Sequence, residues 1–169
     1  MYQVAIGLFD DINEIGEADQ DQNLPTLSNI YSTYGNMLQR SKSLSNNARK
    51  AYELFQKALD AKERAISLGI LKLEESGMGN TFMHLGNAAL ELDEYDESEM
   101  WHRKAIDFKE RPSFKVDMPD LSLSYNNYGY CLWQIGKLDQ AYSTLQKALA
   151  IVQSQKTDLE RGSYRSKRV

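Results

Sequence analysis

Residues 125–149 read YNNYGYCLWQIGKLDQAYSTLQKAL, and this stretch decides the fold. Small and large apolar residues follow Gly129 at offsets of twelve, sixteen and nineteen residues: Ala141, Leu145 and Ala148. Apolar residues recur around them every three to four positions, which is the spacing of an amphipathic helix. Gly136 separates the two halves and is expected to form the turn that reverses the chain. The stretch therefore predicts two helices joined by a short turn.

The same arrangement occurs twice more upstream. The second copy has the same three offsets and consists of Gly86, Ser98, His102 and Ala105. The first copy keeps the spacing of its last three members, which are Ala51, Phe55 and Ala58. Its glycine, Gly35, lies sixteen residues before Ala51 instead of twelve. We expect the four additional residues to lie in the polar stretch 40–47, because a loop absorbs an insertion at little cost.

The three glycines are informative because glycine is a poor helix former. Each costs about 1 kcal/mol of helix propensity relative to alanine. Three such residues at matching positions predict that a neighbouring helix approaches the backbone closely. The closing alanines, Ala58, Ala105 and Ala148, are the expected counterparts on the second helices. Few prolines and many helix formers support an all-α fold.

These spacings resemble the tetratricopeptide repeat, whose signature combines a large residue before Gly, an Ala, an aromatic residue and a closing Ala. Each copy closes with a similar run of five residues, QKALD (56–60), RKAID (103–107) and QKALA (146–150). These runs lie 47 and 43 residues apart, which exceeds the usual repeat length of about 34. Longer repeats of this kind are similar to those of kinesin light chains. The resemblance covers roughly residues 25–155 and implies a right-handed α-solenoid of antiparallel helix pairs. The sequence departs from the signature at Ser98, at His102 and Leu145, and in lacking the closing proline of each repeat.

We expect a single domain over residues 1–169, divided into a partial preceding repeat at 1–18, repeats at 25–77, 78–117 and 118–156, and the start of a further repeat at 157–169. Residues 61–77 are expected to extend the second helix of the first repeat by one turn, with Gly77 near its C-cap. A chain that starts and stops within a repeat leaves apolar end faces, so we expect a homo-oligomer through these end repeats.

Composition and motifs exclude several classes of function. A net charge of −4 disfavours nucleic-acid binding, and no apolar run is long enough for a membrane-spanning helix. The single cysteine fits a reducing compartment, and we expect a cytoplasmic protein. The acidic stretch 91–99 is interpreted as a solvated face. No phosphate-binding loop, dinucleotide fingerprint or nucleophile elbow is present, so we expect neither enzymatic activity nor a cofactor.

Cys131 invites a catalytic interpretation because aromatic residues surround it in the sequence. The equivalent residue is Ala88 in the second copy and Met37 in the first, which is typical of a packing position. An activated thiolate also needs a base or a helix N-terminus beside it, and neither His84 nor His102 is placed to serve. The two histidines do not form a metal site either. We therefore predict no catalytic and no metal-binding residues.

The resemblance implies that the first helices line a concave groove that binds a peptide or a partner helix. The predicted lining is rich in amides and nearly uncharged, and its candidate ligand-binding residues are Asn36, Asn87, Asn126, Asn127, Tyr130 and Trp133. Asparagine can pair with a peptide backbone, and the two rings can serve as anchors. Chaperone-binding members of the family clamp a terminal carboxylate with basic residues. This chain has Ser32, His84, Leu123 and Asn127 near the matching places, so we predict no such clamp.

The sequence thus predicts a non-catalytic module for protein–protein interaction, of the kind used in scaffolds, with a protein or peptide as its ligand. The alternative is a regulatory or sensor segment of a larger signalling ATPase or transcription regulator.

Overall fold

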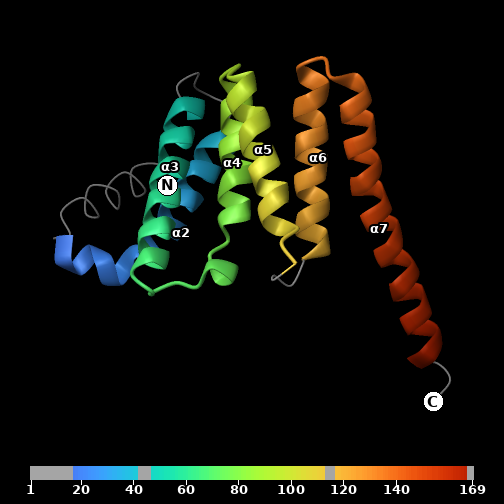
Figure 1. The fold of residues 1–169 in the computed structure, drawn as a ribbon, viewed down its shortest axis with the longest axis horizontal. Coiled ribbons are helices and arrows are strands. Elements are labelled where there is room, and N and C mark those ends of the chain that lie inside the picture. The colour runs from blue at the N-terminus through green and yellow to red at the C-terminus, as the bar shows by residue number, and fades with distance from the viewer. Residues whose placement is uncertain (1–16, 42–46, 113–116, 167–169) are drawn as a thin grey trace.

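The computed structural model describes residues 17–41, 47–112 and 117–166, and these parts of the chain are all-helical. Their six α-helices are α2 (Glu17–Arg40), α3 (Asn47–Ser67), α4 (Met78–Glu91), α5 (Tyr95–Lys109), α6 (Met118–Gln134) and α7 (Leu138–Ser166). Consecutive helices pack as antiparallel pairs, α2 with α3, α4 with α5 and α6 with α7, and the pairs stand side by side (Figure 1). The predicted all-α solenoid of helix pairs is confirmed.

Each of the three glycines lies where its own second helix crosses, as predicted. A methyl group added to the glycine would collide with one large side chain, and the colliding pairs are Gly35 with Phe55, Gly86 with His102 and Gly129 with Leu145. At Gly35 the added carbon would lie 2.6 Å from Phe55 Cε1, well inside van der Waals contact. The close crossing therefore requires glycine at these positions, which offsets its poor helix propensity.

Tight turns join the helices of the second and third pairs. Asp93 and Gly136 occupy equivalent places and both have positive φ, 59° and 79°. The following backbone N–H groups, of Glu94 and Lys137, each donate at 2.9 Å to a carbonyl in the last turn of the preceding helix. In the first pair the additional residues lie between the end of α2 at Arg40 and the start of α3 at Asn47.

The second helix of the first pair is shorter than predicted. It ends at Ser67, where Gly69 takes up a left-handed conformation (φ 71°) and the N–H groups of Ile70 and Leu71 donate to Ala65 O. A 3₁₀ turn at Leu73–Glu75 follows, and Gly77 is the N-cap of α4. The prediction that 61–77 forms one long helix with Gly77 near its C-cap is wrong, because Gly69 ends the helix first.

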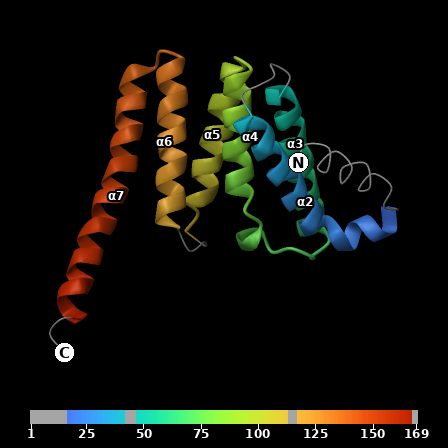
Figure 2. The same cartoon turned by 180° about the vertical axis from the view of Figure 1, so that it is seen from behind.

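The last helix, in contrast, is longer than predicted. α7 runs without a break from Leu138 to Ser166, so the prediction that a new first helix starts at 157 is wrong. The segment 138–161 contains neither glycine nor proline, so no residue in it stops the helix. Residues 167–169 lie outside the described residues, as do residues 1–16, which make up most of the predicted partial repeat at 1–18. α2 begins at Glu17 and contains Pro25, and the helix bends in its first turns (Figure 2).

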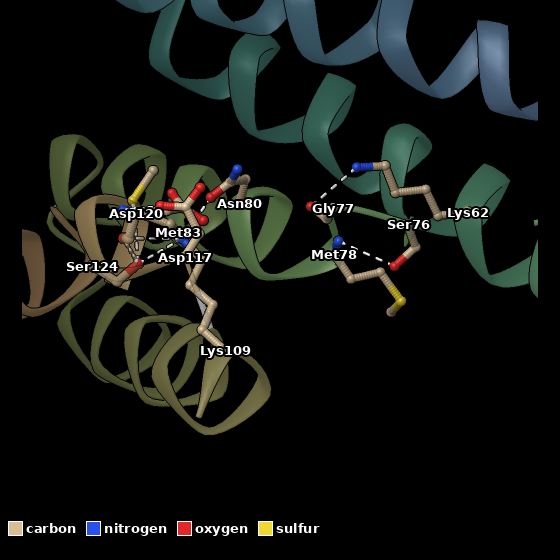
Figure 3. A network of polar contacts seen from close by, with 10 residues as sticks. All are labelled: Lys62, Ser76, Gly77, Met78, Asn80, Met83, Lys109, Asp117, Asp120 and Ser124. Carbon is tan, nitrogen blue, oxygen red and sulfur yellow. Dashed lines mark hydrogen bonds and ion pairs between the residues drawn. The ribbon is translucent and has the colours of Figure 1, made fainter. Parts of the chain in front are cut away.

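Buried lysines join each helix pair to the next. Lys62 and Lys109 each lie four residues after the closing alanine of their repeat, and both ammonium groups reach a hydroxyl near the start of the next first helix. Lys62 Nζ donates to Thr81 Oγ1 at 2.7 Å, and Lys109 Nζ donates to Ser124 Oγ at 2.8 Å. Figure 3 shows the second joint, where the Asp120 carboxylate also lies 2.9 Å from Lys109 Nζ.

The acidic stretch 91–99 also connects pairs rather than forming only a solvated face. Tyr52 of α3 donates its hydroxyl to Glu97 Oε2 at 2.6 Å, and Glu94 pairs with Arg49 of α3. Glu99, which is nearly buried, pairs with Lys137 in the turn directly before α7. The stretch therefore contacts both neighbouring repeats.

Among the described helices, none combines the length and the apolar character needed to cross a lipid bilayer.

Candidate peptide-binding face

The first helices α2, α4 and α6 are neighbours in space and together form one side of the solenoid. The residue after each helix-crossing glycine has the same place on its helix, and these residues are Asn36, Asn87 and Tyr130. Gln39 of α2 donates to Glu91 of α4 at 3.5 Å near the C-terminal ends of these helices. These three of the six candidate residues thus lie in equivalent places along a row of three parallel helices.

Two aromatic rings dominate the α6 end of this face. Tyr130 and Trp133 are 50% and 55% exposed, and their ring centroids lie 5.7 Å apart at a tilt of 39°. Gln134 Nε2 donates to the Tyr130 hydroxyl at 2.8 Å, which holds the ring in place. Large aromatic side chains are normally packed against other residues, so this exposed pair is a candidate anchor for a ligand.

The four candidate asparagines are divided between the three helices. Asn36 and Asn87 are partly exposed on α2 and α4. Asn126 is exposed on α6 and donates to Asn127 Oδ1 at 3.5 Å. The direct contacts among these candidate residues lie within α6, and the other two amides lie farther along the face on α2 and α4.

One member of this face was missed as a ligand-binding candidate. Leu123 is 47% exposed and lies three residues before Asn126 and seven before Tyr130. Leu123, Asn126, Tyr130 and Trp133 therefore share one stripe of α6. The helical spacing of these four residues is visible in the sequence and could have identified Leu123. Leu123 was named above only as a position without the positive charge that a carboxylate clamp requires.

A carboxylate clamp would require positively charged side chains on this face. The residues near the matching positions carry no positive charge. The His84 ring stacks on Phe55 with centroids 5.0 Å apart. Burial, together with the nearby charges of Lys109 and Lys62, lowers the pKa of His84 to about 4, so the ring is neutral at pH 7. These two lysines are themselves hydrogen-bonded between the repeats. The face is accordingly suited to neutral or apolar groups.

Cys131 is a packing residue, as predicted. Its side chain is fully buried, and Sγ lies 3.1 Å from Ser98 Oγ of the preceding pair. Burial raises the pKa of the thiol, so it remains protonated near neutral pH. His102 is also fully buried, stacked on Tyr128 with centroids 6.2 Å apart, and burial lowers its pKa to about 4.

The described part of the chain has no cluster of three or more histidine, cysteine or carboxylate side chains that could hold a metal ion.

A comparison with protein families found a match for part of the chain. Residues 77–154 match the tetratricopeptide repeat family. The matching segment is thus similar to a tetratricopeptide repeat array. It comprises α4, α5, α6 and most of α7, and the α2–α3 pair that precedes it has the same glycine crossing and the same lysine joint. Tetratricopeptide repeats typically serve as non-catalytic protein-interaction modules, and this is the class of function that the match indicates. No curated protein matches the chain significantly.

Proposed function

We propose that the tetratricopeptide face formed by α2, α4 and α6 binds a peptide or a partner helix and has no catalytic role. The observation that carries this proposal is the half-exposed pair Tyr130 and Trp133, held in place by Gln134 at one end of the face. The repeats belong, in this proposal, to the stretched type found in kinesin light chains, since Gly86 and Gly129 lie 43 residues apart.

The two rings can supply much of the binding free energy. An aromatic side chain buries about 150–250 Å², so each half-exposed ring has roughly 100 Å² left to cover. At about 25 cal/mol per Å² the pair contributes about 5 kcal/mol. A micromolar complex needs about 8 kcal/mol in total, and backbone hydrogen bonds to Asn36, Asn87 and Asn126 are the expected source of the remainder.

The ligand is expected to have apolar side chains and no requirement for a free carboxyl terminus. Leu123, Tyr130 and Trp133 form an apolar stripe, and His84 on the neighbouring helix is neutral. A helix with apolar residues three and four apart, or an extended peptide with two large side chains, fits this stripe.

A displayed peptide library selected on the wild-type protein tests the proposal. Selected peptides should bind with micromolar affinity in calorimetry and lose at least tenfold in affinity for the Tyr130→Ala/Trp133→Ala variant. Tyr95→Ala is the matched control, because Tyr95 is an exposed ring on α5 rather than on the first-helix face.

Selected peptides that bind the double variant and the wild type equally well would place the binding site elsewhere. A peptide ending in Glu-Glu-Val-Asp serves as a second arm of the same experiment. Micromolar binding that depends on its free carboxylate would contradict the absence of a clamp.

A further inference from the structure

A row of exposed, large apolar residues runs along the outer side of α7, away from the proposed peptide-binding face. The row consists of Leu138, Tyr142, Leu145, Leu149 and Val152. Their spacing alternates between four and three residues, which places them on one stripe of the helix. Between 39% and 67% of each residue is exposed. Such a continuous apolar stripe is normally buried against another helix.

The preceding pairs show what this stripe contacts elsewhere in the same chain. Tyr52 of α3 is equivalent to Tyr142, and it is 6% exposed because it packs under α5 and donates its hydroxyl to Glu97. Ile106 of α5 is equivalent to Leu149, and it is also 6% exposed because it packs against α6. In each case the next helix pair provides the cover. The stripe on α7 is thus the same stacking surface without its cover.

The first of the described helices, α2, presents the opposite surface. Ala88 and Cys131 lie at one equivalent place on α4 and α6 and are fully buried, and Cys131 contacts Ser98 of the preceding pair. Met37 has this place on α2 and is 43% exposed. The first pair therefore exposes the side of a first helix that the other two pairs bury.

The chemistry at one pair of stacking positions indicates which partner fits. Inside the chain these positions form the two lysine–hydroxyl joints, Lys62 with Thr81 and Lys109 with Ser124. At the two outer faces both members are apolar. Val152 on α7 is equivalent to the lysines, and Ile30 on α2 is equivalent to the hydroxyl residues. Val152 cannot donate a hydrogen bond to a hydroxyl group, so a hydroxyl placed beside it would lack a partner. Ile30 is apolar and can pack directly against Val152.

We propose that the α7 stripe receives α2 of a second copy of this chain, so that copies stack head to tail. Val152 of one copy then packs against Ile30 of the next, and Met37 lies beside the stripe where Ala88 and Cys131 lie in the internal joints. The outer faces match each other better than they match an internal face, since a lysine placed opposite Ile30 would be buried without an acceptor. Because the two faces differ, each added copy leaves one face of each kind open.

Light scattering coupled to size-exclusion chromatography tests the stacking on the full chain. The weight-average mass should rise with concentration from 19.3 kDa through twice that value and beyond. Leu149→Glu blocks one face and Met37→Glu blocks the other, and each variant alone should stay monomeric. Both positions are exposed, so the fold should be retained, and circular dichroism checks this. Gln146→Glu is the control, because it adds the same charge to an exposed position of α7 outside the stripe.

The decisive step is to mix the two blocked variants. Each retains one intact face of the opposite kind, so the mixture should form a complex of two chains that grows no further. A wild-type chain that remains monomeric at every concentration would overturn the proposal. So would a Met37→Glu variant that self-associates as the wild type does, since that result indicates a symmetric contact between two α7 stripes.

Discussion

Alanine substitutions at two equivalent glycines, Gly86 and Gly129, should have different effects on stability. At Gly86 the added methyl would lie 2.8 Å from His102 Nε2, and the whole His102 ring is buried. At Gly129 it would lie 2.6 Å from Leu145 Cγ, but in the single chain no described helix covers Leu145, which is 39% exposed. The first collision therefore cannot be relieved by moving the side chain into solvent, whereas the second can.

The expected magnitudes follow from two opposing effects. Forcing a methyl group against a buried ring costs about 1–3 kcal/mol, while replacing glycine by alanine within a helix contributes about 1 kcal/mol of stability. Gly86→Ala should therefore lower the free energy of unfolding by up to about 2 kcal/mol. For Gly129→Ala the two effects nearly cancel, and the change should be about zero or a slight gain.

Urea unfolding followed by circular dichroism and by tryptophan fluorescence measures both variants. Repeat arrays do not always unfold in one step, and the two tryptophans, Trp101 on α5 and Trp133 on α6, report on different pairs. A double-mutant cycle with His102→Ala isolates the contact between the added methyl and the ring. Equal destabilisation by the two glycine variants, or a cycle without coupling energy, would refute the close crossing as the reason for glycine.

Three further substitutions test the buried polar groups. Burial lowers the pKa of His102 from 6.5 to about 4, so stability is complete above pH 6.5 and falls as the pH approaches 4, by on the order of 3 kcal/mol from this group. His102→Leu should reduce this loss in thermal melts, and an unchanged pH slope would contradict the assignment. Burial also lowers the pKa of Lys62 from 10.5 to about 8, so the free energy of unfolding should rise as the pH increases from about 8 to 10.5. Lys62→Met should remove that rise without loss of stability at pH 7. Lys109→Met, which leaves an aspartate unpaired, should instead destabilise by about 1–3 kcal/mol in the same assay. Cys131 should react with a thiol reagent only as fast as the protein unfolds, and rapid labelling of the native state would contradict its role in packing.

Much of this fold could be predicted because its strongest signal is repeated. Gly35, Gly86 and Gly129 recur with fixed partners, and each repetition strengthens the prediction of a close helix crossing. The helix ends were harder to predict, since neighbouring residues can each end a helix and the sequence does not rank them. Gly69 and Gly77 both adopt the left-handed conformation, and the sequence does not indicate that the earlier one ends the helix.

The candidate site, like the fold, was predicted only in part. The resemblance to the tetratricopeptide repeat predicted that Tyr130 and Trp133 would lie on the first-helix face, and their helical spacing would have included Leu123. The lysine joints were missed for another reason, because the repeat comparison stopped at the closing alanines. Lys62 and Lys109 lie four residues beyond them in both copies, so a longer alignment would have found the pair. Their acceptors lie on other helices and become apparent only once the pairs are stacked.

The difference between inner and outer joints has a physical consequence for the array. An ammonium group buried between two pairs is stable only in the register that supplies its acceptors, so Lys62 and Lys109 each favour one alignment of adjacent pairs. An apolar contact such as that proposed between Val152 and Ile30 has no such directional requirement. We therefore expect the internal stacking to be fixed, and the stacking between copies to be weaker and to depend on concentration. The peptide-binding face would then keep its geometry within each chain whether or not the chains associate.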